Sequence, residues 1–113
     1  MLNAARVCTV SALVAPLVIA AGTADAQQRR GQSVANLWQN NCISCHGANG
    51  QGGSAQSLLD GNYMTDGSNR ALFESIKSGH ADFGMPAYGE TMSDAEVWGL
   101  TNYIRELQER ARR

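Results

Sequence analysis

The sequence predicts an all-α domain of three to four helices joined by long loops. Three segments place apolar residues at helical spacing, and the last of them follows a Ser-x-x-Glu capping box. The stretches between these segments are rich in glycine, serine and asparagine, which favour loops. No segment shows the apolar–polar alternation of a half-buried strand, and no internal repeat is present. The chain of 113 residues is long enough for one such domain.

The N-terminus has the features of an export signal. Arg6 precedes the apolar run Val7 to Ala21, and Ala24-Asp25-Ala26 fits a small-x-small cleavage pattern. An uncleaved membrane anchor is the alternative, but the apolar run is shorter than the ~20 residues needed to span a bilayer. We expect residues 1–26 to be a cleaved signal peptide and residues 27–113 to be the mature, periplasmic domain, with no stable membrane insertion. Cleavage would also remove Cys8.

Net charge and chain length limit the partners and the core that this domain can have. The formal net charge is −1 and the sequence pI is about 6.0, so charge gives no argument for nucleic acid or an anionic membrane surface as a partner. Residues 27–113 are few for a self-sufficient hydrophobic core. A large apolar cofactor in the middle of the domain would supply part of that core.

The first predicted helix begins at Ser33, a residue type favoured at N-caps, and runs to Asn41. Its apolar face consists of Val34, Leu37 and Trp38. The polar residues 27–32 before it are expected to be a loose leader. Residues 47–57 after it are expected to form a loop.

A second helix is predicted over residues 69–78, with Ser68 as its N-cap and Gly79 ending it. Its apolar face consists of Leu72, Phe73 and Ile76. Residues 80–92 contain two glycines and a proline, so they cannot form a regular helix.

The last helix is predicted from the capping box Ser93–Glu96 to about Gln108. Its apolar face recurs at helical spacing and consists of Val97, Leu100, Ile104 and Leu107. Arg110, Arg112 and Arg113 follow it; cations suit a helix C-terminus, and we expect a solvated end rather than a docking patch.

The run Cys42-Ile43-Ser44-Cys45-His46 is the most informative motif of the chain. A Cys-x-x-Cys-His run is where haem is covalently attached in c-type cytochromes. Two thiols three positions apart lie on one side of a helical turn, where each can add to one vinyl group of the same porphyrin. His46 is then held beneath the ring as an iron ligand. The motif therefore predicts one covalent haem c, bound through Cys42 and Cys45, with His46 as the proximal ligand.

Two other interpretations of the cysteines remain open. Cys42, Cys45, His46 and His80 could together count as four zinc ligands, although adjacent Cys45 and His46 make awkward joint ligands. Thioredoxin-like dithiol chemistry needs no histidine after the second cysteine, and no strand–helix alternation surrounds the motif.

Met85 is the best candidate for the second axial ligand. It lies in Gly84-Met85-Pro86-Ala87-Tyr88-Gly89, where proline stiffens the backbone and glycines permit tight turns. His80 is the main rival, and an open distal site is the third option. Met64 and Met92 are expected to fill the core. The choice matters because thioether ligation raises the haem potential, whereas bis-histidine ligation lowers it.

With these residues placed, residues 27–113 resemble the class I c-type cytochromes, which are small, soluble and carry one haem. Trp38 stands where such cytochromes carry an aromatic residue on their first helix, and Leu100-x-x-Tyr103-Ile104 looks like their last-helix motif. The segment Gly84–Tyr88 is similar to their methionine-ligand loop. The resemblance implies a cytochrome c-like fold wrapped around one haem.

The chain departs from this family at two positions. Val34 replaces the usual glycine eight residues before the first cysteine, so we expect a wider crossing of the terminal helices or a shifted contact. Gln56 stands where the family tends to have proline, whose carbonyl accepts the N–H of the ligand histidine; a backbone carbonyl can do this without proline. The segment Gly52–Gly61 is similar to cytochromes that accompany periplasmic quinoprotein dehydrogenases.

The resemblance implies a one-electron carrier and not an enzyme, with iron cycling between Fe(II) and Fe(III). Its donor would be a dehydrogenase, a quinoprotein among the candidates, or a membrane complex, and its acceptor an oxidase or another cytochrome. A haem-c sensor or peroxidase-like protein, with Met85 not bound, is the alternative within the same cofactor class. No catalytic residue is predicted.

Overall fold

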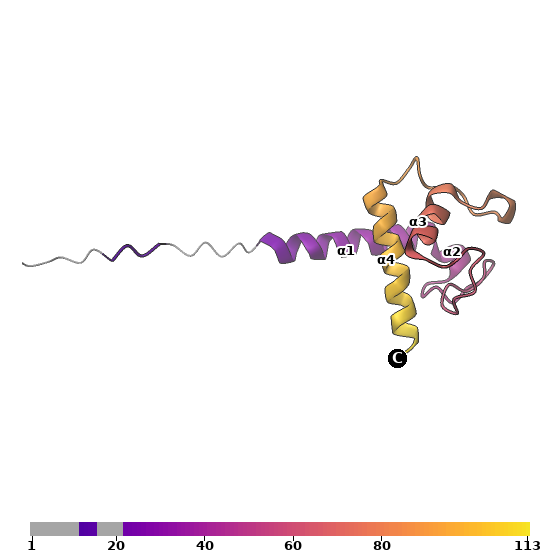
Figure 1. Ribbon diagram of the computed structural model, residues 1–113, viewed down its shortest axis with the longest axis horizontal. Helices are drawn as coiled ribbons and strands as arrows, with labels where there is room; N and C mark the ends of the chain where they lie inside the picture. Colours follow the sequence, from indigo (N-terminus) through magenta and orange to yellow (C-terminus); the bar gives the residue numbers. More distant parts are fainter. Residues whose placement is uncertain (1–11, 16–21) are drawn as a thin grey trace, which may run out of the picture.

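The computed structural model describes residues 12–15 and 22–113, so most of the predicted signal peptide lies outside the described residues. The elements are the helices α1 (Gly22–Asn41), α2 (Ile43–His46), α3 (Asn69–Ser78) and α4 (Asp94–Ala111), with a 3₁₀ turn η1 (Ala81–Phe83). No strand occurs in the described part of the chain, which confirms the all-α prediction. No helix in that part is both long and apolar enough to cross a membrane. Figure 1 shows α1 and α4 crossing at a steep angle, with α3 and the loops gathered beside the crossing.

The expected start of the first helix at Ser33 is wrong. Helix α1 begins at Gly22 and continues through Ser33, so residues 27–32 are helical rather than a loose leader. This stretch is built largely of glutamine and arginine, which are good helix formers. Once the turn carrying Trp38 is fixed by packing, each further residue adds one backbone hydrogen bond, and propagation needs no apolar face.

The caps of α3 and α4 are as predicted. The Ser68 hydroxyl accepts a hydrogen bond from the Ala71 N–H at 3.1 Å. The Ser93–Glu96 capping box is complete, with both reciprocal bonds formed at 2.8 and 3.2 Å. Helix α4 continues three residues beyond Gln108, to Ala111.

The core lies where α1 and α3 each pack against α4. All the apolar residues predicted for the faces of α3 and α4 are buried there, together with Trp38 and Met92. The Trp38 ring packs against Tyr103 with ring centroids 5.6 Å apart, which confirms the expected contact between the first and last helices. On the other side of α4, Trp98 stacks on Phe73 at 4.4 Å. The Lys77–Asp94 ion pair at 2.8 Å joins the end of α3 to the start of α4.

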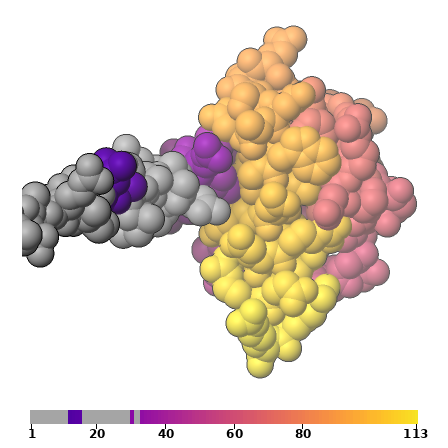
Figure 2. Space-filling view, turned by 60° about the vertical axis from the view of Figure 1, so that its left-hand side comes forward, coloured from indigo at the N-terminus to yellow at the C-terminus, as the bar shows by residue number. Residues whose placement is uncertain are grey.

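The α1–α4 crossing shows how the chain accommodates Val34. We expected either a wider crossing of the two helices or a shifted contact between them. The structure shows the second, because Val34 lies against Gly99 on α4. A Cβ added to Gly99 would come within 2.7 Å of Val34 Cγ2. The small residue needed for close approach is therefore supplied by α4 instead of α1. Figure 2 shows α4 and the segment before it, in orange to yellow, running the length of one face of the domain.

Candidate functional site

The Cys-x-x-Cys-His motif forms a single helical turn at the end of α1. Cys42 separates α1 from α2, and its carbonyl accepts the N–H groups of Cys45 and His46 at 3.3 and 3.0 Å. Trp38 supports this turn, because its indole Nε1 donates to the Ala48 carbonyl at 3.0 Å. The Gly52 N–H donates to the His46 carbonyl at 2.8 Å and closes the following loop against the turn. The spacing of the motif thus gives the compact turn that its chemistry requires.

A cavity of about 500 Å³ opens beside this turn. Cys42, Cys45 and His46 line one part of it, and His80 and Met85 line another. Core residues form more of the wall, among them Leu100 and Ile104 of α4. The volume lies within the roughly 300–1,000 Å³ range of cofactor sites. The structure therefore brings the four predicted site residues, Cys42, Cys45, His46 and Met85, to one apolar cavity.

The His46 imidazole is half-buried, and burial lowers its pKa below the usual value; the nearby Gln56 backbone acts in the opposite direction. The backbone of Gln56 therefore lies near His46, and in class I cytochromes the backbone carbonyl of a proline was expected at this place. His46 Nδ1 itself is fully buried and has no partner of full hydrogen-bond geometry among the described residues. A buried imidazole kept neutral is suited to binding a metal through its other nitrogen.

The two thiols are free and differ in environment. Burial raises the pKa of Cys42 to about 11. Cys45 is exposed, and hydrogen bonds from Ser54 and Ser44 lower its pKa. Two unpaired thiols, a buried imidazole and a thioether around one apolar cavity fit a covalently held haem.

The Met85 loop is held by its own backbone. His80 and Met85 exchange two backbone hydrogen bonds, at 2.9 and 3.1 Å, across the η1 turn. Gly79, with φ 66° and ψ −173°, lies directly beneath the next residues: an added Cβ would come within 2.6 Å of the Pro86 carbonyl carbon. This backbone region is essentially restricted to glycine. The sequence assigned Gly79 only to the end of α3, so its close approach to the loop was missed.

Tyr88 ties the same loop to two helices. Its hydroxyl donates to the Asn41 carbonyl at the end of α1, 3.1 Å away, and its N–H donates to the Ile76 carbonyl of α3, also at 3.1 Å. Burial is the main cause of its raised pKa. Tyr88 therefore links the Met85 loop to the residue that precedes Cys42.

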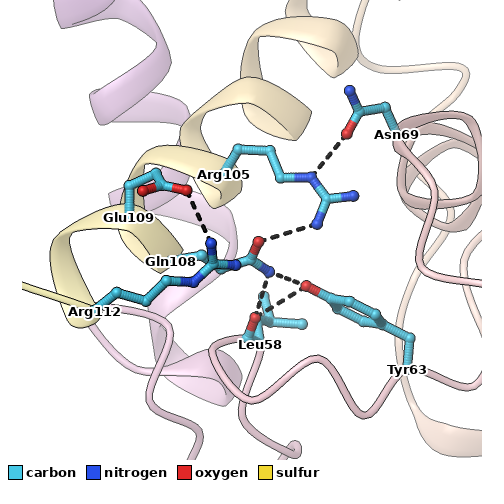
Figure 3. Close-up of polar contacts among 7 residues, drawn as sticks. All are labelled: Leu58, Tyr63, Asn69, Arg105, Gln108, Glu109 and Arg112. Carbon is cyan, nitrogen blue, oxygen red and sulfur yellow. Dashed lines mark hydrogen bonds and ion pairs between the residues drawn. The ribbon is translucent and has the colours of Figure 1, made fainter.

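A polar network joins α4 to the loop that carries Leu58 and Tyr63, as Figure 3 shows. Arg105 donates to Asn69 at 2.7 Å and to Gln108 at 3.0 Å. The buried Gln108 side chain donates in turn to the Leu58 carbonyl at 2.7 Å and to the Tyr63 hydroxyl. Leu58 and Tyr63 both line the cavity. Gln108 was expected only to end the last helix; its role depends on a loop distant in sequence and leaves no local signal.

One expectation is wrong at the site, and one of the open interpretations of the cysteines is not supported. Met64 does not fill the core: its side chain is 57% exposed at the cavity border, whereas Met92 is buried as expected. Tyr63 and Thr65, the neighbours of Met64, also line the cavity. Cys42, Cys45, His46 and His80 do not form a metal-binding group; no cluster of three or more His, Cys, Asp or Glu side chains occurs among the described residues. The zinc interpretation is therefore not supported.

The all-α fold, the Cys-x-x-Cys-His turn and the apolar cavity together define a c-type cytochrome domain. The chain belongs to the family described as cytochrome c oxidase, cbb3-type, subunit III, which matches residues 29–104. Membership of a cytochrome c family implies covalently attached haem c and makes an electron-carrier role plausible.

The chain is similar to two oxidase subunits. It is 32% identical over 78 residues to the Cbb3-type cytochrome c oxidase subunit CcoP of Azospirillum brasilense, and 32% identical over 76 residues to the subunit FixP of Azorhizobium caulinodans. The alignments cover 63% and 65% of this chain but 26% of each relative, so the chain spans about a quarter of the length of the curated relatives it matches. These relatives give no support to a quinoprotein dehydrogenase as partner.

Proposed function

We propose that this chain is a single-haem electron carrier of the periplasm. The observation that carries the proposal is the meeting of Cys42, Cys45, His46 and Met85 at one apolar cavity. Bound haem c supplies a one-electron Fe(II)/Fe(III) couple. Cys42 and Cys45 would hold the ring covalently, His46 and Met85 would bind the iron, and the apolar walls would exclude water. With both ligands supplied by the protein, catalysis at the iron is not expected.

The oxidase family suggests the direction of electron flow. CcoP and FixP are subunits of cbb3-type oxidases, so we propose an oxidase of this type as acceptor, with a dehydrogenase or a membrane complex as donor. Residues 1–26 are proposed as a cleaved export signal and residues 27–113 as the working domain. Haem attachment through two thiols suits a compartment outside the cytoplasm.

One preparation of the exported protein tests this function. Mass spectrometry should give the mass of residues 27–113 plus one haem, and ferrous protein should show the sharp α and β bands of low-spin haem c. The ferric protein should show the far-red iron–sulfur absorption of His/Met ligation. Replacing Cys42 and Cys45 by alanine should abolish covalent haem. A wild-type chain exported without covalent haem would refute the proposal.

A further inference from the structure

His80 and Met85 form a hydrogen-bonded antiparallel pair. The two residues exchange both backbone hydrogen bonds, His80 N–H to Met85 O at 2.9 Å and Met85 N–H to His80 O at 3.1 Å. In such a pair the two Cα atoms lie about 5.5 Å apart and the side chains stand on the same face. Both residues also line the cavity that Cys42, Cys45 and His46 line. Two side chains able to bind iron are therefore presented side by side to the same cavity.

The position of His80 does not depend on what the Met85 sulfur binds. The pair is closed by main-chain bonds, and Gly79 packs directly against the backbone of Pro86. The His80 imidazole is half-buried, and no hydrogen bond or ion pair engages it in the part of the chain that the structure describes. Its ring nitrogens are thus not committed to another described residue.

Met64 offers a useful contrast. It too lines the cavity and carries a sulfur, but its side chain is 57% exposed and its backbone forms no such pair with Met85. Proximity to the cavity is common to Met64 and His80, whereas a fixed placement beside Met85 belongs to His80.

We propose that His80 is a reserve axial ligand, which binds the haem iron when the Met85 sulfur does not. This inference rests on the proposed function. The site then passes from histidine–methionine to bis-histidine ligation instead of opening to small molecules. Because bis-histidine ligation lowers the potential relative to histidine–methionine ligation, the exchange turns one carrier into a lower-potential carrier. It also keeps the iron six-coordinate, so the domain retains electron transfer and gains no reactivity at an open site.

The experiment compares haem-loaded, exported variants of the protein: Met85→Ala, Met85→Leu, His80→Ala, the double variant Met85→Ala/His80→Ala, and Met64→Ala as the matched control. Leucine at position 85 removes the sulfur while conserving volume, so at least one single variant should keep the fold. Circular dichroism and haem content establish folding for each. The readouts are ferric electron paramagnetic resonance, far-red absorption, midpoint potential and carbon monoxide binding to the ferrous form.

The expected result is specific to His80. Loss of Met85 should remove the far-red absorption and lower the potential, yet leave a low-spin ferric spectrum of bis-histidine type. The double variant should become high-spin and bind carbon monoxide readily. His80→Ala and Met64→Ala should leave the wild-type spectrum unchanged.

Three results would overturn the proposal. A high-spin spectrum in both Met85 single variants means that His80 does not bind. A low-spin spectrum in the double variant means that another group binds. If His80→Ala alone became high-spin and bound carbon monoxide, His80 would be the iron ligand of the wild-type protein and not a reserve ligand. Failure of the proposed function is recognised separately, by a wild-type chain that carries no covalent haem.

Discussion

Replacing Gly99 by alanine should destabilise the domain, although alanine is the better helix former. The new Cβ would lie 2.7 Å from Val34 Cγ2, whereas carbon atoms pack at about 3.5–4.0 Å. Val34 is β-branched and stiff at χ1, so it cannot rotate away cheaply. Overpacking of this kind costs about 1–3 kcal/mol, and alanine returns about 0.8–1 kcal/mol of helix propensity. The expected net loss is therefore about 1 kcal/mol.

The sign of this effect should reverse when Val34 is also shortened. In a Val34→Ala background the overlap disappears, and Gly99→Ala should stabilise the domain by up to about 1 kcal/mol. The two substitutions should thus be coupled by about 1–3 kcal/mol. The matched control is Asn102→Ala, which raises helix propensity at an exposed position of the same helix.

The assay is urea unfolding of the haem-loaded protein, followed by far-ultraviolet circular dichroism, with equal m-values required across the series. If Gly99→Ala stabilised the wild-type background, or had the same effect in both backgrounds, the close crossing of α1 and α4 would not be what fixes Gly99. The reasoning would then be refuted.

Three further predictions concern the site. Gly79→Ala should weaken or abolish the far-red iron–sulfur band, because Cβ would overlap the backbone of the Met85 loop. Gly84 also has a positive φ (79°), so alanine there costs about 1–2 kcal/mol of backbone strain, but its Cβ meets nothing within 4 Å, and Gly84→Ala should keep the band. Gln108→Leu should cost about 0.5–1.5 kcal/mol, since it removes the buried amide that joins α4 to the Leu58 carbonyl and the Tyr63 hydroxyl. It should speed amide exchange in residues 58–67, whereas Gln39→Leu, an exposed control, should not. In the haem-free chain iodoacetamide should alkylate Cys45 faster than Cys42, because hydrogen bonds lower the pKa of Cys45 whereas burial raises that of Cys42. Peptide mapping by mass spectrometry measures both rates, and equal rates would contradict this explanation.

Features set by neighbouring residues could be predicted from the sequence. The bounds of α3, the Ser68 cap and the Ser93–Glu96 capping box each depend on a few consecutive side chains, and all are confirmed. The Cys42–His46 turn belongs to the same class, because its chemistry requires its spacing. The start of α1 could not be predicted in this way, because a solvated polar stretch can continue a helix without any apolar pattern.

Features set by contacts between distant segments could not be predicted. Gly99 matters because of Val34 on another helix, and Gly79 because of the backbone after Met85. Gln108 reaches a carbonyl 50 positions earlier. In each case the residue is ordinary for its local element, and its role follows from what the fold brings against it. The resemblance to class I cytochromes implied that the last helix crosses the first helix, and Trp38 packs against Tyr103 at that crossing.

The cavity explains why so few apolar residues suffice for this domain. Five of the buried core residues also line it, namely Trp38, Leu72, Ile76, Leu100 and Ile104. A large apolar group held by Cys42 and Cys45 would fill the cavity and add its own contacts to these five side chains. The cysteines that attach the cofactor therefore also complete the hydrophobic core.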